Sequence, residues 1–191
     1  MKTRVNVERR EFLKAGAAAG AGLTLAFWLP RGIAQISGPG KTAGAAGPAP
    51  FAPNAFVRIG TDNSVTVIVK HLEMGQGTYT GLPTLVAEEL DADWAQIKVE
   101  GAPADAKLYN NLFWGPAQGT GGSTAIANSF EQMRKAGAAA RAMLVAAAAR
   151  DWHVPATEIT VSKGVVAHRA RGRKATFGEL AGKAAALPVP T

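Results

Sequence analysis

The sequence predicts an α+β domain in which β-hairpins and short strands pack with a long, alanine-rich helix. Short runs of β-branched residues, such as 65–69, lie between turn-forming Gly, Asn and Asp residues, as strands of hairpins do. A much longer segment, ending near Trp152, is dominated instead by alanine, which is a strong helix former. Because the two kinds of run alternate along the chain, we expect strands and helices in the same domain.

Composition places the chain among globular proteins and excludes several kinds of site. Its 191 residues are 47% hydrophobic and 18% charged, which suits one or two domains with a packed core. Because the chain has no cysteine, it offers no disulfide, thiolate metal site or iron–sulfur cluster of its own. Residues 1–34 carry +4 of the net charge of +7, and the remaining +3 gives little reason to expect a nucleic acid.

Residues 1–34 have the three-part form of an export signal. A basic start is followed by an apolar run rich in Ala and Gly, residues 15–29, and then by small residues suited to cleavage. The paired Arg9 and Arg10 resemble a twin-arginine motif, although Glu8 stands where Ser or Thr is usual. We therefore expect residues 1–34 to direct twin-arginine export to the periplasm, with membrane association if the apolar run is retained as an anchor.

The first half of the chain predicts a linker followed by alternating elements. Residues 35–54 are rich in Gly, Pro and Ala and have no hydrophobic period, which is typical of a linker. Two β-branched runs, 55–59 and 65–69, flank an Asp-Asn turn and predict a hairpin. Helical spacing of apolar residues predicts a helix over 81–90, and the run 97–100 predicts another strand.

A long irregular segment, 101–122, leads into the alanine-rich helix, and loops of this length are often functional. The helix should begin at Ser123 or Thr124 and end near Trp152. Its predicted apolar face comprises Met133, Ala136, Ala140, Met143, Leu144 and Ala147. Its predicted solvated face carries Arg134, Lys135, Arg141 and Arg150.

The last part of the chain predicts a hairpin and a short helix. The strands are expected near 158–161 and 165–168, and the basic segment 169–174 is interpreted as an exposed hairpin tip. A helix over 177–186 ends the predicted domain, which spans 55–187. Residues 188–191 look like a truncated linker.

Two glycine-rich loops, 73–78 and 119–124, each precede a predicted helix. Glycine lets the backbone approach a ligand closely, and a helix N-terminus favours a bound anion. The amide of Gln76 can both donate and accept hydrogen bonds, while Ser123 and Thr124 can cap the long helix. Neither the dinucleotide fingerprint nor the P-loop is present, so the pattern indicates a different phosphorylated organic cofactor.

The run from His71 to Thr78, followed by Gly119 to Thr124 before the long helix, resembles the molybdopterin-binding subunit of the xanthine dehydrogenase and aldehyde oxidase family. The likeness is greatest to the branch that contains the isoquinoline 1-oxidoreductase beta subunit. Further stretches that carry it are 85–94 and 104–111. The resemblance covers residues 53–187 and implies that the cofactor is molybdopterin, either free or as the cytosine dinucleotide.

The resemblance also implies the site. In this family the first loop touches the pterin, and the second lies at its phosphate or attached nucleotide. Molybdenum is held by sulfur atoms of the cofactor, so no metal ligand is expected from the chain. The residues implied in cofactor binding are Met74, Gly75, Gln76, Gly77, Thr78, Gly121, Gly122, Ser123 and Thr124.

The catalytic residue cannot be named from the sequence. The family's Gly-Gly-Gly-Phe-Gly loop and the segment with its glutamate base are not found in the chain. Glu73 belongs to the first loop, and Glu88 and Glu89 are interpreted as solvated. His71, His153 and His168 are scattered and are expected to have structural or surface roles.

The resemblance therefore implies the N-terminal part of a molybdenum hydroxylase large subunit, either a truncated frame or one piece of a split subunit. Such an enzyme hydroxylates a small aldehyde or N-heterocycle with oxygen from water. The implied partners are the remainder of the large subunit and a separate 2Fe–2S subunit, and the chain by itself should be inactive. The alternative is an exported, non-catalytic module that binds a phosphorylated or nucleotide-like ligand.

Overall fold

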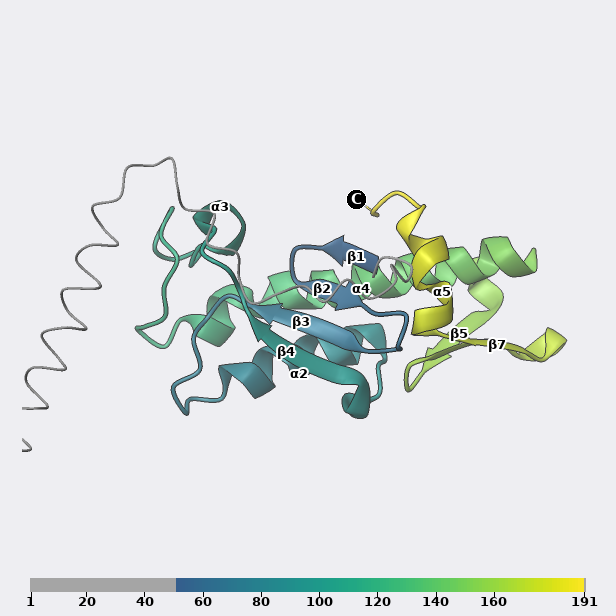
Figure 1. The fold of residues 1–191 in the computed structure, drawn as a ribbon, viewed down its shortest axis with the longest axis horizontal. Helices are drawn as coiled ribbons and strands as arrows, with labels where there is room; N and C mark the ends of the chain where they lie inside the picture. The colour runs from purple at the N-terminus through teal and green to yellow at the C-terminus, as the bar shows by residue number, and fades with distance from the viewer. Residues whose placement is uncertain (1–50, 191) are drawn as a thin grey trace, which may run out of the picture. The chain divides into compact units, whose positions relative to one another are not determined.

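A computed structural model describes residues 51–190 of the chain (Figure 1). The predicted export signal, residues 1–34, lies outside the described residues, as does the predicted linker up to residue 50. The last four linker residues differ from the prediction, because Phe51–Asn54 form a strand, β1. This strand forms because it pairs with β2, and the composition of the segment gave no sign of that pairing.

The first sheet has the strand order β1-β2-β3-β4, with the further strands β2 (Val57–Ile59), β3 (Val65–Val69) and β4 (Ile97–Gly101). The predicted hairpin is confirmed, since β2 pairs antiparallel with β3. In contrast, β3 and β4 are parallel, and they are joined by helix α2 (Thr78–Leu90). This crossover places the start of α2 at the end of the sheet where β3 ends.

Helices α2 and α4 (Ala125–Trp152) pack against each other and cover one face of this sheet (Figure 1). The predicted apolar face of α4 is confirmed, since all six of its residues are buried. The two helices approach so closely at Gly137 that a Cβ there would lie 2.7 Å from the carbonyl oxygen of Val86. The crossing of α2 and α4 therefore requires a glycine.

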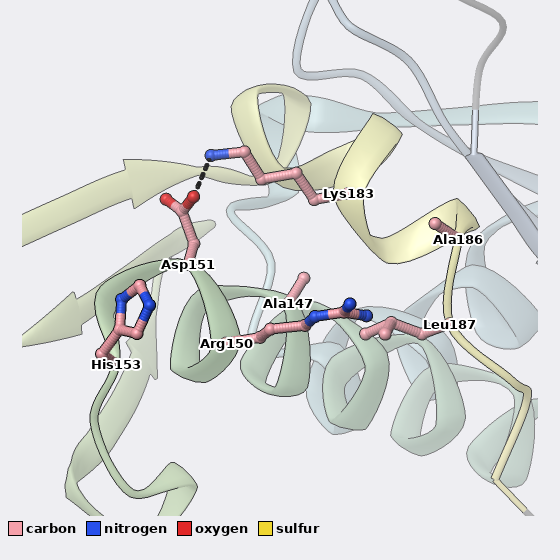
Figure 2. A pocket seen from close by; sticks show the side chains of 7 residues that line it. All are labelled: Ala147, Arg150, Asp151, His153, Lys183, Ala186 and Leu187. Carbon is pink, nitrogen blue, oxygen red and sulfur yellow. Dashed lines mark ion pairs between the residues drawn. The ribbon is translucent and has the colours of Figure 1, made fainter.

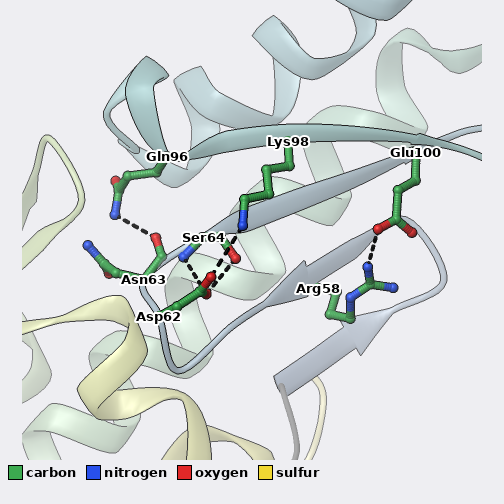
Figure 3. Close-up of polar contacts among 7 residues, drawn as sticks. All are labelled: Arg58, Asp62, Asn63, Ser64, Gln96, Lys98 and Glu100. Atoms are coloured by element: carbon green, nitrogen blue, oxygen red, sulfur yellow. Dashed lines mark hydrogen bonds and ion pairs between the residues drawn. The ribbon is translucent and has the colours of Figure 1, made fainter. Parts of the chain in front are cut away.

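Charged side chains of the first sheet and its β2–β3 turn pair with one another (Figure 3). Arg58 pairs with Glu100 across the sheet, and the Lys98 ammonium lies 3.2 Å from the Asp62 carboxylate. Hydrogen bonds from Ser64, and then from Lys98, lower the pKa of Asp62 to about 2. These side chains lie over β3, in which all five residues are buried.

The second sheet has the order β5-β6-β7, comprising β5 (Ile159–Ser162), β6 (Val165–His168) and β7 (Arg173–Thr176). The predicted hairpin is confirmed, but the basic turn is shorter than predicted. Gly172 has φ of 63° and reverses the chain, so Arg173 pairs with His168 and begins β7. Helix α5 (Phe177–Ala185) then packs against α4.

Together the described elements confirm the predicted α+β fold. The segment predicted to be irregular contains one short helix, α3 (Ala106–Tyr109), whose N-terminus is capped by the Asp105 carboxylate. Within residues 51–190, none of the helices has the length and apolar character required to cross a membrane.

Candidate functional site

The structure brings the two predicted glycine-rich segments together. We call residues 70–77, between β3 and α2, the first loop, and residues 110–124, before α4, the second loop. Both lie at the same end of the described domain (Figure 1). The backbone N–H of Leu72 in the first loop donates to the Thr120 hydroxyl in the second, at 2.8 Å. The site is therefore formed by segments that are 48 residues apart at this contact and that meet because α2 packs on α4.

The first turn of α2 is occupied by a carboxylate of the chain itself. Glu73 accepts hydrogen bonds from the backbone N–H groups of Tyr79, Gly75 and Gly77 at 2.8, 2.7 and 3.0 Å. The Tyr79 N–H, followed by that of Gly77, lowers the pKa of Glu73 to about 2. The same contacts explain why α2 begins at Thr78, three residues before the predicted start. That α2 binds an anion at its N-terminus stays a prediction, and the Glu73 carboxylate already takes the Tyr79 N–H there.

The Gln76 amide closes the first loop on itself. Its oxygen accepts from the Met74 N–H at 2.5 Å, and its nitrogen donates to the Leu72 carbonyl at 2.6 Å. Gly75 and Gly77 have φ of 95° and 87°, and no described atom lies within 4 Å of the place of a Cβ at either. Open backbone at these glycines and the 70% exposed side chain of Met74 therefore form the outer surface of the loop.

Thr78 lies beneath that surface. Its side chain is 1% exposed, and its hydroxyl donates to the Leu72 carbonyl at 3.3 Å. Of the five residues predicted in the first loop, Thr78 therefore supports the loop from inside, whereas the others are exposed.

The first turn of α4 is arranged in the opposite way. Thr124 is its N-cap residue, but the Thr124 hydroxyl donates back to the Gly121 carbonyl and accepts from the Asn111 amide, both at 2.8 Å. No described side chain caps the helix. The predicted capping role of Ser123 and Thr124 is therefore wrong. The first N–H groups of a helix have no partner within it, so those of α4 remain for a ligand or water.

The glycines of the second loop serve two different purposes. A Cβ at Gly119 would lie 2.4 Å from the Trp114 ring, so the ring would have to shift, whereas a Cβ at Gly121 would lie 3.2 Å from it, a tight contact. Gly122 has φ of 62°, and no described atom lies closer than 3.7 Å to the place of its Cβ. Gly122 and the exposed Ser123 therefore present open backbone beside the α4 N-terminus.

A buried polar cluster joins the two loops, and the sequence analysis did not assign it. His71, Asn111, Asn128 and Ser129 are each at most 6% exposed. The Asn128 amide nitrogen lies 3.3 Å from His71 Nε2 and 3.1 Å from Asn111 Oδ1. The sequence signal for this cluster is a pair of polar residues, Asn128 and Ser129, on the otherwise apolar buried face of α4. The structural role expected for His71 is confirmed.

Lys70 is the cationic residue at the base of the first loop. It is 4% exposed, its ammonium donates to the Asn110 carbonyl at 3.0 Å, and burial lowers its pKa. Within residues 55–190, no carboxylate forms an ion pair with it. The loop end of the domain thus contains a positive charge that lacks an acidic partner there.

A cleft of about 400 Å³ lies elsewhere, between the end of α4 and α5 (Figure 2). It is lined by Arg150, His153 and Lys183, and the Lys183 ammonium is 2.7 Å from the Asp151 carboxylate. That contact accounts chiefly for the lowered pKa of Asp151. None of the predicted site residues lines this cleft, and we do not assign the cofactor to it.

The described residues offer neither a metal cluster nor a free base near the loops. No group of three or more His, Cys, Asp or Glu side chains in residues 55–190 could hold a metal ion. Glu88 is exposed and Glu89 pairs with Arg134, both in the last turn of α2. The third histidine, His168, is buried with Nε2 2.7 Å from the Glu158 carboxylate, which confirms a structural role.

Open glycine backbone beside an uncapped helix N-terminus suits an anionic organic molecule. The family model described as the molybdopterin cofactor-binding domain matches residues 2–190. The chain belongs to this family. The resemblance that the motifs indicated is thereby confirmed.

Two curated relatives agree with the family. The chain is 47% identical over 133 residues to the isoquinoline 1-oxidoreductase subunit beta of Brevundimonas diminuta, covering 69% of this chain and 17% of that protein. It is 30% identical over 187 residues to the membrane-bound aldehyde dehydrogenase (pyrroloquinoline-quinone) of Gluconacetobacter polyoxogenes, covering 95% and 22%. The chain thus spans about a fifth of the length of these relatives.

Solved structures show the same fold. Quinoline 2-oxidoreductase from Pseudomonas putida 86 matches with a TM-score of 0.50, and reconstituted CO dehydrogenase from Oligotropha carboxidovorans with 0.51. In both cases 21% of residues are identical, and the match covers 66% of this chain and 15% of the other.

Proposed function

We propose that this chain is a cofactor-holding part of a molybdenum hydroxylase large subunit that hydroxylates aldehydes or N-heterocycles with oxygen from water. The observation that carries the proposal is the uncapped N-terminus of α4, next to the open Gly122 of the second loop, in a chain of the molybdopterin-binding family. The family match favours this function over that of a non-catalytic ligand-binding module.

The two loops have different tasks in this proposal. Met74, Gly75 and Gly77 present the outer surface of the first loop to the pterin, while Gln76 and Thr78 hold the loop in shape. The segment from Gly121 to Thr124 and the first N–H groups of α4 bind the phosphate, or the phosphates of the cytosine dinucleotide form. The bound cofactor supplies molybdenum, held by its own sulfur atoms, as the redox centre.

The rest of the enzyme must come from other polypeptide segments. Large apolar side chains on and next to the loops are between 41% and 70% exposed, and such a concentration marks an interaction surface. They are Leu72, Met74, Leu108, Leu112, Phe113, Trp114, Ile126 and Phe130. We propose that the remainder of the large subunit, with the catalytic base, docks on these side chains other than Met74, which faces the pterin. The family resemblance implies that electrons leave through a separate 2Fe–2S subunit, and this chain has no cysteine to hold such a cluster itself.

A change of charge at Ser123 tests the proposed phosphate site. Ser123→Glu places a carboxylate beside the α4 N-terminus, whereas Ser123→Gln has similar size without the charge. Like charges about 4 Å apart repel by about 1 kcal/mol in bulk water, so we expect a roughly fivefold to tenfold loss of cofactor affinity with Glu. Molybdenum and pterin per protein are measured in the complex co-expressed with its partner subunits. Equal content in both variants would contradict the assignment.

The proposed destination is the periplasm, reached by twin-arginine export of residues 1–34, with association to the membrane. One relative is named as membrane-bound, which supports the last point. Replacing Arg9 and Arg10 with Lys should leave the uncut protein in the cytoplasm, as fractionation and immunoblotting would reveal. Unchanged periplasmic accumulation would exclude this route.

A further inference from the structure

The Asn128 side chain contacts both loops from inside the domain. It lies in the first turn of α4 and is 6% exposed. Its amide nitrogen is 2.7 Å from the Thr124 carbonyl and 3.1 Å from Asn111 Oδ1, both in the second loop. The same nitrogen is 3.3 Å from Nε2 of His71 in the first loop. One amide group thus faces acceptors from two segments that are far apart in sequence.

The chemistry of these partners fixes the orientation of Asn128. A carbonyl can only accept, so the amide nitrogen and not the oxygen must face Thr124. The amide nitrogen has two hydrogens, and its two shortest contacts are those with the Thr124 carbonyl and Asn111 Oδ1. The contact with His71 Nε2 is the longest of the three. Burial lowers the pKa of His71, which favours the neutral ring beside this amide.

The second loop is anchored further through Asn111. The Asn111 amide donates to the Thr124 hydroxyl at 2.8 Å, and its backbone N–H donates to the Ala117 carbonyl at 2.9 Å. If either loop moves, at least one of these buried groups loses its partner, which is more costly than losing an exposed hydrogen bond. The positions of the two loops are consequently linked through Asn128.

We propose that Asn128 is a positioning residue that sets the two cofactor loops relative to each other, so that cofactor retention depends on a side chain buried beneath them. This inference rests on the proposed function. Ser129 provides the matched control. It is equally buried and lies 3.2 Å from His71 Nε2, but none of its hydrogen bonds reaches the second loop.

The first test uses hydrogen exchange of backbone amides in the 191-residue chain without cofactor. In Asn128→Ala we expect exchange of the Leu72 and Asn111 amides to be about tenfold faster, equivalent to about 1.4 kcal/mol of local stability. In Asn128→Ala the exchange rates of the β3 amides should rise no more than they do in Ser129→Ala. In Ser129→Ala the exchange rate of the Asn111 amide should stay at the wild-type value. Faster exchange in one loop alone, or equally throughout the domain, would overturn the proposal.

Asn128→Asp separates the hydrogen-bond donor from the shape of the side chain. An aspartate fills the same space but places an acceptor against the Thr124 carbonyl and Asn111 Oδ1, so exchange should be at least as fast as in Asn128→Ala. Normal loop exchange in Asn128→Asp would show that only volume matters. If Asn128→Ala does not fold, Asn128→Ser, whose short hydroxyl reaches the Thr124 carbonyl alone, replaces it in both tests.

The second test measures molybdenum and pterin in the complex with the partner subunits. Asn128→Ala should retain the cofactor about tenfold less tightly than wild type, and Ser129→Ala should stay close to wild type. A wild-type complex without cofactor would overturn the proposed function. A loaded wild type with equally loaded Asn128→Ala would overturn the positioning role of Asn128 and leave the proposed function intact.

Discussion

The N-termini of α2 and α4 both follow glycine-rich segments, yet their first turns are satisfied in opposite ways. At α2 the Glu73 carboxylate accepts from the Tyr79 N–H and from two loop glycines. At α4 the N-cap side chain, Thr124, turns back to the Gly121 carbonyl, and no described side chain takes its place. One helix end is closed by the chain's own charge and the other is open.

This difference shows what decides whether a glycine-rich loop before a helix can bind an anion. The positive end of the helix dipole attracts any negative group within reach, including one supplied by the loop itself. The first loop carries a glutamate two residues before Gly75, whereas residues 110–124 contain no acid. Only α4 therefore retains an unmatched N-terminus for a phosphate from outside the described domain.

The largest expected effect comes from separating the two helices. Gly137→Val would place a Cβ 2.7 Å from the Val86 carbonyl oxygen, so α2 and α4 must move apart and both N-termini with them. Overpacking of this kind costs about 1–3 kcal/mol in the free energy of unfolding. Urea denaturation should show this loss relative to Ala138→Val, an exposed neighbour with the same β-branched side chain. Equal free energies of unfolding for Gly137→Val and Ala138→Val would mean that α2 and α4 are not in tight contact at Gly137.

A smaller effect is expected from opening α2. Backbone N–H groups, chiefly that of Tyr79, lower the pKa of Glu73 from 4.5 to about 2, so the ionised carboxylate stabilises the folded state. This stability is present above pH 4.5 and is lost as the pH falls toward 2. Wild type should therefore melt at a higher temperature than Glu73→Gln at pH 6, and the two melting curves should converge near pH 2.

Glu131→Gln is the control for that comparison. Glu131 is exposed and its pKa is also lowered, by Lys135, but it caps no helix. A pH dependence of Glu73→Gln no larger than that of Glu131→Gln would contradict the closure of α2 by Glu73.

The smallest effect is also the most direct test of the contrast. Ala127 and Thr80 are the exposed third residues of α4 and α2. Relative to Gln at the same position, Ala127→Glu should stabilise the protein by about 0.3–1 kcal/mol, because it supplies the missing negative charge at α4. Thr80→Glu should give no gain in stability over Thr80→Gln, because the Glu73 carboxylate already lies at the α2 N-terminus. Equal increases in melting temperature at both helices would contradict the proposed difference between the two N-termini.

The elements that the sequence predicted correctly are those with strong local patterns. The β2–β3 hairpin follows from β-branched runs around an Asp-Asn turn, and α4 follows from alanine content and the spacing of Met133, Ala140 and Leu144. The errors lie where a partner was needed. β1 forms in a linker-like composition because β2 pairs with it, and α2 begins early because Glu73 caps it.

At the site, the sequence by itself determined which segments matter, because glycines with positive φ and the family motifs are local properties of the chain. It could not show that Gly121 lies against the Trp114 ring, that Gln76 bonds within its own loop, or that Asn128 contacts both His71 and Asn111. The contact between Asn128 and His71 crosses 57 residues of sequence and forms only when the packing of α2 on α4 brings the two loops together. The tertiary structure therefore decided that one buried amide contacts both loops, because hydrogen bonding between distant segments depends on distances that no local pattern encodes.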